Sequence, residues 1–323
     1  MSAPAPEKSP RRRSLRRRLF LWLTLGIVLI AGAWGVRYFW FSRPEGAGPA
    51  GPQVAREPFS RVWTTRKVLL LGVGDSITAG YGVPASHSYV GRLAANPDDE
   101  FSDMEGVCLS AVLPSLRSEN TAVSGSTSLD HLEILRKRLR AQDPDVLGLV
   151  VMTTGGNDLI HSYGHVPPRE GAMYGATLQQ ARPWIDAYEK RLTAMMELIQ
   201  ERFPGGCHIF LADIYDPTDG TGSALGTGLP AWPDGGPIHR AYNEVIHRCA
   251  AGHPGVHLVP IWQEFLGHGI HCTKFWNAHY RAEDPHYWYG SNLEDPNDRG
   301  YDAVRRLFLI EIAKVAGELG KPR

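Results

Sequence analysis

Acidic residues are almost missing from the N-terminus of this chain, and basic residues are in the minority in the rest. Residues 1–43 contain nine Lys and Arg but a single acidic residue, Glu7. The 323-residue chain has 34 basic and 34 acidic residues, so residues 44–323 hold 25 basic and 33 acidic side chains, a net charge of −8. Because nucleic-acid binding requires a basic face, this acidic body argues against a nucleic-acid partner.

Cysteine is also scarce, and its spacing excludes the common zinc motifs. The chain has four cysteines, and no two of them are spaced Cys-x-x-Cys. Two disulfides are compatible with an oxidising compartment, with three possible pairings, and four buried free thiols are the alternative. The cysteines are Cys108, Cys207, Cys249 and Cys272.

Two common glycine-rich motifs are missing as well. Residues 72–78 read GVGDSIT, in which Ile77 stands where a dinucleotide-binding loop needs its third glycine. Thr78 stands where the nucleophile elbow of the α/β-hydrolases needs its second glycine. No His-x-x-x-His pair lies on a predicted helix. We therefore expect neither a cofactor nor a bound metal.

The N-terminal region has the features of a membrane anchor. Six arginines precede 18 uncharged residues from Leu19 to Val36, which as a helix would span about 27 Å. The excess of basic residues before this stretch predicts a cytoplasmic N-terminus and an extracytoplasmic domain. We predict a basic tail at 1–18, a transmembrane anchor at 19–41, a flexible Pro/Gly-rich linker at 42–60 and one domain at 61–323. A signal peptide cleaved after the small residues 31–33 is the alternative.

Apolar runs alternate with helical patterns through the predicted domain. This alternation predicts an α/β fold, a doubly wound five-stranded parallel sheet with helices on both faces. The strands are expected at 68–73, 121–123, 146–152, 207–214 and 256–261. The main helices are expected from about 88 and at 128–139, 183–202, 238–250 and 300–319. Residues 162–178, 216–236 and 263–294 have no such pattern, and loops of this length usually shape a site.

Residues suited to acyl transfer follow three of the predicted strands. Ligands bind at the carboxyl ends of parallel strands, where Ser76, Gly125 and Asn157 are expected. A serine hydroxyl becomes a useful nucleophile only when a base takes its proton and N–H donors hold the oxyanion. A backbone N–H at Gly125 and the side-chain amide of Asn157 are such donors. Their occurrence at successive strand ends predicts one composite site.

These blocks resemble those of the SGNH (GDSL-type) serine hydrolases. The matching segments are GDSIT at 74–78, NTAVSGST at 120–127 and GGND at 155–158. The resemblance implies a flavodoxin-like fold and the hydrolysis of esters. It also implies that Ser76 is the nucleophile and that the oxyanion hole consists of the Ser76 N–H, the Gly125 N–H and the Asn157 amide.

The last block departs from the family pattern. Members usually carry Asp-x-x-His before Pro-Asn, whereas this chain has Asn292 in the aspartate slot and Asp295 in the histidine slot. An ordinary carboxylate is a weak base at neutral pH. We therefore expect Asp295 to orient a histidine from elsewhere, with His286 as the first candidate. Three other histidines in the same loop remain alternatives: His271, then His268 and His279.

These observations predict an extracytoplasmic serine esterase. Its partners would be the membrane, through the N-terminal helix, and an O-acyl or acetyl ester of a lipid or carbohydrate, cleaved through an acyl-serine intermediate. A non-catalytic binding module on the same fold is an alternative, because a fold does not fix a function. Transfer of the acyl group to a carbohydrate instead of water is another.

Overall fold

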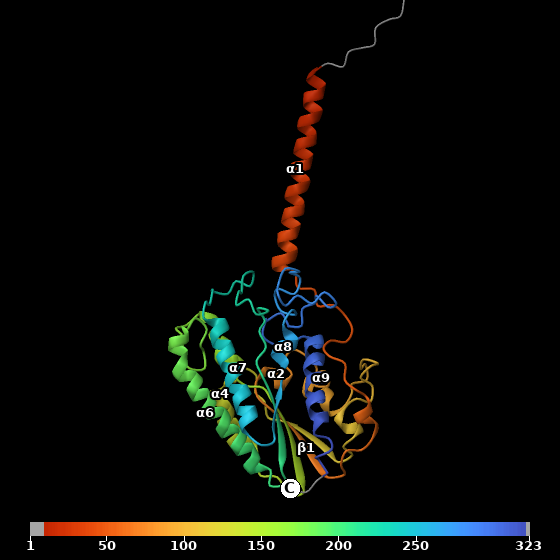
Figure 1. Ribbon diagram of the computed structural model, residues 1–323, viewed down its shortest axis with the longest axis vertical. Helices are drawn as coiled ribbons and strands as arrows, with labels where there is room; N and C mark the ends of the chain where they lie inside the picture. Colours follow the sequence, from red (N-terminus) through yellow and green to blue (C-terminus); the bar gives the residue numbers. More distant parts are fainter. Residues whose placement is uncertain (1–9, 321–323) are drawn as a thin grey trace, which may run out of the picture. The chain divides into compact units, whose positions relative to one another are not determined.

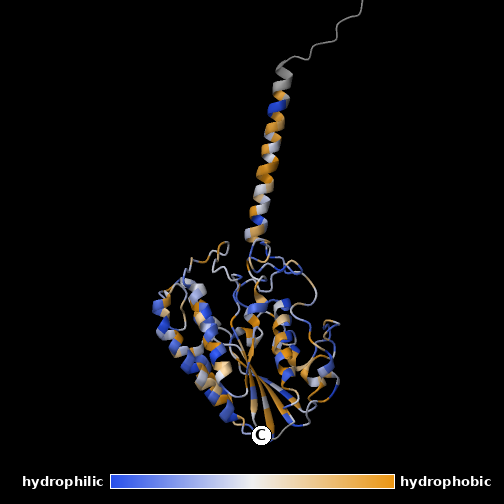
Figure 2. Cartoon of the chain, in the orientation of Figure 1, coloured by the Kyte–Doolittle hydropathy of each residue, from blue (hydrophilic) through white to orange (hydrophobic). Residues whose placement is uncertain are grey.

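The computed structural model describes residues 10–320, which form an N-terminal helical unit and a globular domain that begins at Arg43. The helical unit is α1 (Pro10–Phe41). Its residues Arg17–Phe41 have a mean hydropathy of 2.2, and Figure 2 shows apolar colouring along most of them. Among the described helices, α1 alone is long and apolar enough to cross a membrane, a property that signal sequences share. Residues 1–9 of the predicted basic tail lie outside the described residues.

The domain is built on the five-stranded parallel sheet predicted from the sequence. Its strand order is β2-β1-β3-β4-β5, the doubly wound order of flavodoxin-like folds. The strands are β1 (Lys67–Val73), β2 (Leu116–Asn120), β3 (Val146–Met152), β4 (Cys207–Ala212) and β5 (Val256–Val259). The predicted fold class is therefore confirmed.

Helices cover both faces of the sheet because side chains along its central strands are apolar on both faces. In β1, Leu70 packs into the core on one face and Leu69 and Leu71 into the core on the other. The Leu70 face is covered by α3 (Tyr89–Ala94), α8 (Ile261–Phe265) and α9 (Asp298–Lys314). The opposite face is covered by α4 (Ser128–Arg138), α6 (Leu178–Arg202) and α7 (Gly235–Gly252), as Figure 1 shows. Short elements complete the chain: η1 (Glu57–Ser60), α2 (Ser76–Ala79), η2 (Leu109–Ala111), α5 (Gly156–Ile160) and η3 (His161–Gly164).

Several element boundaries differ from the prediction, and for two of them the structure shows the physical reason. The second strand is β2 at the sheet edge, whose sequence LRSEN is mostly exposed and lacks the apolar run used to place it at 121–123. Helix α6 begins five residues before Pro183, because Thr177 and Gln180 form a capping box that starts it earlier.

The predicted flexible linker at 42–60 is instead packed on the domain. The Arg299 guanidinium donates to three carbonyl oxygens within residues 45–49, and the Ala50 N–H donates to Asp302 Oδ2 at 3.1 Å. Three apolar side chains of the segment are buried, namely Ala50, Val54 and Phe59. Pro and Gly composition indicated flexibility, but these contacts with distant residues fix the segment and move the start of the domain to Arg43.

The state of the four cysteines decides between disulfides and buried thiols. Each lies within the described part of the chain, each is buried, and no disulfide joins any two of them. The structure therefore has four buried thiols rather than any of the three disulfide pairings.

Candidate active site

Ser76 lies where β1 ends and the short helix α2 begins. The turn between them requires a glycine, since Gly74 has φ 142° and a Cβ there would stand 2.2 Å from the Thr153 carbonyl oxygen. The Ser76 side chain is 8% exposed. Its backbone N–H, at the first position of α2, has no hydrogen-bond partner among residues 10–320. The turn thus places a hydroxyl and a free N–H together at the carboxyl end of the sheet.

Asp75 fixes this turn to the neighbouring strand. Its Oδ1 accepts from the Ile77 N–H at 3.2 Å, which caps α2, and from the Thr153 hydroxyl at 2.8 Å, just beyond β3. The pKa of Asp75 is raised to about 6, chiefly by burial and also by the charge of Asp295, against the lowering effect of the Thr153 hydrogen bond. Asp75 therefore has a structural role directly beneath Ser76.

Gly125 and Asn157 lie in loops that are hydrogen-bonded to one another and to the Ser76 turn. The Gly74 carbonyl accepts from the Val123 N–H at 3.0 Å, which holds the loop of Gly125 against the end of β1. The Asn157 amide donates one of its two hydrogens to the Ser126 carbonyl at 2.8 Å. Gly125 has φ 78°, a left-handed conformation that favours glycine, and within the described chain its N–H makes no hydrogen bond. The structure thus brings the predicted oxyanion residues into one network.

A buried histidine, His131 of α4, is hydrogen-bonded to this network through Ser126 and Thr154. Its Nε2 lies 2.8 Å from Ser126 Oγ, and its Nδ1 lies 2.8 Å from Thr154 Oγ1. Because the Ser126 hydroxyl donates to the Val123 carbonyl at 2.6 Å, we assign the ring proton to Nε2, and Nδ1 accepts from Thr154. Burial lowers the pKa of His131 to about 4, so the ring is a neutral bridge between the second and third blocks.

Asp295 lies beside Ser76, and its carboxylate is oriented by a tight local turn. The side chain is 4% exposed, and Oδ2 accepts from Asn292 Nδ2 at 2.7 Å. The Asp295 N–H donates back to Asn292 Oδ1 at 3.2 Å. Burial raises the pKa of Asp295, and hydrogen bonding with the side chains of Ser76 and Asn292 lowers it. Oδ1 is buried and has no partner in hydrogen-bond geometry among the described residues, although the Ser76 hydroxyl is near enough to lower the pKa of the carboxyl.

His286, the base predicted from the sequence, is held by other groups. Its Nδ1 lies 2.5 Å from Asp284 Oδ1, and the same carboxylate binds the Arg299 guanidinium at 3.0 and 2.9 Å. The ring also packs against Gly46, where a Cβ would stand 2.6 Å from His286 Cγ. In the described chain no hydrogen bond or ion pair joins His286 to Ser76 or Asp295, so His286 is not paired with the nucleophile.

The three alternative histidines are engaged elsewhere in the same loop region. His268 stacks on Trp288, with ring centroids 3.4 Å apart, and burial lowers its pKa to about 4. His271 Nε2 bonds the Ser223 carbonyl at 2.8 Å. His279 lies against Gly220. None of the three contacts Ser76 within residues 10–320.

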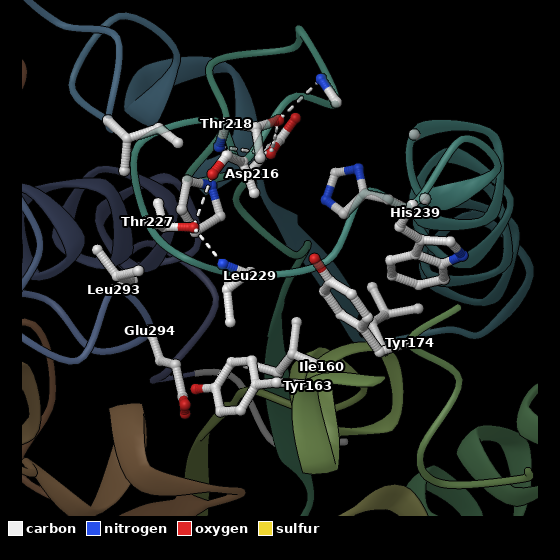
Figure 3. A pocket seen from close by; sticks show the side chains of 18 residues that line it. Ile160, Tyr163, Tyr174, Asp216, Thr218, Thr227, Leu229, His239, Leu293 and Glu294 are labelled. Atoms are coloured by element: carbon white, nitrogen blue, oxygen red, sulfur yellow. Dashed lines mark hydrogen bonds between the residues drawn. The ribbon is translucent and has the colours of Figure 1, made fainter. Parts of the chain in front are cut away.

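An apolar cavity, shown in Figure 3, adjoins this site. It offers about 130 Å³ of free space and is formed largely by the loops that lacked a sequence pattern. Two wall residues link it to the site, since Ile160 follows Asn157 on α5 and Glu294 precedes Asp295. Further wall side chains include Tyr163, Tyr174, Leu229, Trp232 and Leu293. A cavity of this kind can receive the apolar part of a substrate bound at Ser76.

The order and spacing of these blocks match a known family. The sequence model of the GDSL-like Lipase/Acylhydrolase family matches residues 73–303, which is more than half of the chain and includes every residue discussed above from Ser76 to Arg299. The chain belongs to this family. The resemblance seen in its sequence blocks is therefore confirmed.

Individual relatives of this GDSL-like hydrolase are distant. Protein YpmR of Bacillus subtilis (strain 168), itself uncharacterized, is 28% identical over 162 residues, which are 50% of this chain and 57% of YpmR. An extracellular lipase from Streptomyces rimosus is 19% identical, with a TM-score of 0.51 over 76% of this chain and 99% of the lipase. That likeness confirms the fold. A mutant acetylxylan esterase from Geobacillus stearothermophilus is 18% identical, with a TM-score of 0.48 over 80% of this chain and 99% of the esterase.

Sequence reasoning missed several residues at the site of this GDSL-like hydrolase. His131 was read only as part of a helix, although its position four residues after Thr127 places it under the second block. Glu294 was not singled out. Burial, together with the charges of Asp295 and Asp75, raises its pKa to about 7. Adjacent acidic residues in a functional block were the signal that could have drawn attention to it. Among residues 10–320, no cluster of three or more His, Cys, Asp or Glu is arranged to hold a metal ion.

Proposed function

We propose that this hydrolase is a serine esterase in which Ser76 carries the acyl group between two half-reactions. The observation that carries the proposal is the position of Ser76, at a helix start between a buried carboxylate and unpaired N–H groups. In the first half-reaction Ser76 Oγ attacks the ester carbonyl and the alcohol leaves. In the second, water attacks the acyl-serine and releases the acid. The proposed substrates are O-acyl or acetyl esters of a lipid or carbohydrate.

The proposed oxyanion hole consists of the N–H groups of Ser76 and Gly125 and the second amide hydrogen of Asn157. The hole stabilises the negative charge that develops on the carbonyl oxygen in the transition state. The Asn157 amide is held by its bond to the Ser126 carbonyl, so its remaining hydrogen has a fixed direction. Fixed donors of this kind need no reorganisation during the reaction.

The apolar cavity that is lined by Ile160 and Glu294 supports a preference for short acyl groups. Its free space of about 130 Å³ is slightly smaller than the ~150 Å³ cavity that holds a benzene ring in another protein. An acyl group of about six carbons or fewer would therefore fit, and a fatty acyl chain would extend beyond the walls. Hydrolysis rates for p-nitrophenyl acetate, butyrate, hexanoate and palmitate test this preference, with palmitate expected to be the poorest substrate.

We further propose that α1 anchors the protein and that the domain is extracytoplasmic. The 25-residue segment Arg17–Phe41, with a mean hydropathy of 2.2, and the arginines at its N-terminal side support this orientation. The mass of the protein from a membrane fraction and its sensitivity to protease in intact cells provide the test. An uncleaved chain whose domain is digested from outside is expected. Cleavage after Ala33 would establish a signal peptide instead, and a protected domain would contradict the proposed location.

The test of the nucleophile compares two buried serines. Ser76→Ala is expected to reduce p-nitrophenyl butyrate hydrolysis to the background rate. Ser88→Ala removes the side-chain cap of α3, a hydrogen bond of 3.1 Å to the Gly91 N–H. It is expected to keep normal turnover and lose about 1 kcal/mol of stability. Turnover that survives in Ser76→Ala would refute the proposed function, and a folded wild-type protein without esterase activity would favour a binding module.

A further inference from the structure

We propose that Asp295 itself accepts the proton of the Ser76 hydroxyl, so that this esterase uses a serine–carboxylate pair and no catalytic histidine. The inference rests on the proposed function, because it concerns how Ser76 is activated. It replaces the sequence-based expectation that Asp295 orients a displaced histidine.

The first observation is the state of the Asp295 carboxylate. Oδ1 is buried and has no closely aligned partner in residues 10–320, whereas Oδ2 is held by Asn292 at 2.7 Å. A buried carboxylate oxygen without a partner is costly, so its retention calls for a functional reason. The Ser76 hydroxyl is close enough to this carboxyl to lower its pKa. Catalytic hydrogen bonds are often loose without substrate and shorten when it binds.

The second observation is that both partners in the last block have changed together. In the pattern that the family usually shows, an aspartate accepts a hydrogen bond from the catalytic histidine. Here the hydrogen-bond polarity is reversed, because Asn292 donates through Nδ2 to the Asp295 carboxylate. An aspartate at 292 would place two carboxylates in contact, so an amide is the side chain that suits a carboxylate at 295. The pair therefore forms a consistent orienting unit for a carboxylate base.

The third observation is the location of the four histidines that the sequence offered as candidate bases. His286 is tied to Asp284, whose charge also binds Arg299, and this cluster holds the segment around Gly46 rather than Ser76. The contacts of His268, His271 and His279 also lie elsewhere in the described structure. His286 is thus assigned to the docking of the N-terminal segment, and Asp295 is the proton acceptor beside Ser76.

The surroundings of Asp295 make it a stronger base than an ordinary carboxylate. Burial raises its pKa, and the acidic groups that face the same space are Asp75 and Glu294. The phenols of Tyr215 and Tyr301 also lie close enough for Asp295 to raise their pKa values. No Lys or Arg among the described residues opposes these effects on Glu294 or Asp295. A base whose pKa is shifted toward neutrality is better matched to accept a serine proton.

The proton balance of the proposed cycle is closed. As Ser76 Oγ bonds to the acyl carbon, its proton moves to Asp295 Oδ1. When the bond from that carbon to the alcohol oxygen breaks, Asp295 returns the proton to the alcohol. A water molecule then gives a proton to Asp295 as it attacks the acyl carbon. Finally, the bond to Ser76 breaks and Ser76 recovers that proton.

The experiment measures kcat/KM against pH with p-nitrophenyl butyrate for wild type, Asp295→Ala, Asp295→Asn and His286→Ala. Removing a general base costs about 10²- to 10⁴-fold, so this loss is expected in both Asp295 variants. His286→Ala is expected to remain within a few-fold of wild type. Formate, a small carboxylate, should restore turnover to Asp295→Ala in proportion to its concentration, whereas chloride at the same ionic strength should not. A merely structural role of Asp295 would not produce this rescue.

A double variant with Asn292→Asp and Asp295→His supplies the second readout. It rebuilds the family's usual pair, and its rate should follow the titration of an imidazole, near pH 6.5. Wild-type turnover in Asp295→Asn together with its loss in His286→Ala would overturn the inference while leaving Ser76 as the nucleophile. Absence of turnover in folded wild type would overturn the proposed function and the inference with it.

Discussion

The substitution Asn157→Ala tests whether the network behind Ser76 serves catalysis. The change removes both amide hydrogens, one bound to the Ser126 carbonyl at 2.8 Å and one proposed to face the oxyanion. Loss of an oxyanion donor lowers kcat by about 10²- to 10³-fold, or about 2.7–4 kcal/mol. Loss of the structural bond leaves the Ser126 carbonyl unsatisfied and costs about 1–3 kcal/mol of folding free energy. We expect KM to change little, since the donor acts mainly in the transition state.

Asn243→Ala is the matched control. Asn243 is also buried and also donates its amide to a backbone carbonyl, that of Ile214, at 2.9 Å. It additionally accepts from the Ile214 N–H at 2.8 Å, so its removal should destabilise the fold at least as much. The assay is steady-state hydrolysis of p-nitrophenyl butyrate, with denaturant unfolding of both variants. Equal losses of kcat in the two variants would refute the assignment of Asn157 to the oxyanion hole.

Three further predictions follow from the same contacts. His131→Phe removes the bridge between Ser126 and Thr154, and it should lower the free energy of unfolding by about 1–3 kcal/mol and reduce kcat more than it raises KM. Burial raises the pKa of Glu294 from its usual 4.5 to about 7, so the native state binds a proton that the unfolded chain releases, and stability falls as pH rises between those values. Glu294→Gln should therefore be more stable than wild type at pH 8, by about 1 kcal/mol after allowance for its partial exposure, and equally stable at pH 4 in thermal melts. Ala224→Trp places a large side chain in the cavity wall, and it should reduce hexanoate hydrolysis relative to acetate hydrolysis.

The parts of the fold that depend on local patterns were predictable from the sequence. The apolar runs at 68–73 and 146–152 correspond to β1 and β3, because central strands of a parallel sheet are buried on both faces. The edge strand β2 carries an exposed polar sequence and gives no such signal. The positions of Ser76, Gly125 and Asn157 were also predictable, because they follow neighbouring parallel strands and therefore lie at the carboxyl end of the sheet.

The parts that depend on contacts between distant residues were not predictable. Arg299 fixes the segment at 45–49, which is about 250 residues away in the chain, and composition alone indicated a flexible linker there. Asp284, which binds Arg299, also binds His286 and so holds it in the same group of contacts. In the sequence, Asn292 and Asp295 appear only as two departures from the family pattern. The structure shows that Asn292 donates a hydrogen bond to Asp295 and that Asp295 Oδ1 has no hydrogen-bond partner among the described residues.

Covalent labelling is the most direct test of whether Ser76 is the nucleophile of the proposed esterase. The protein is treated with a fluorophosphonate, which reacts with activated serines, and the modified peptide is identified by mass spectrometry. We expect a single stoichiometric adduct on Ser76, absent from Ser76→Ala and formed much more slowly in Asp295→Asn. An adduct on any other serine, or an unlabelled Ser76 in a protein that hydrolyses esters, would contradict it.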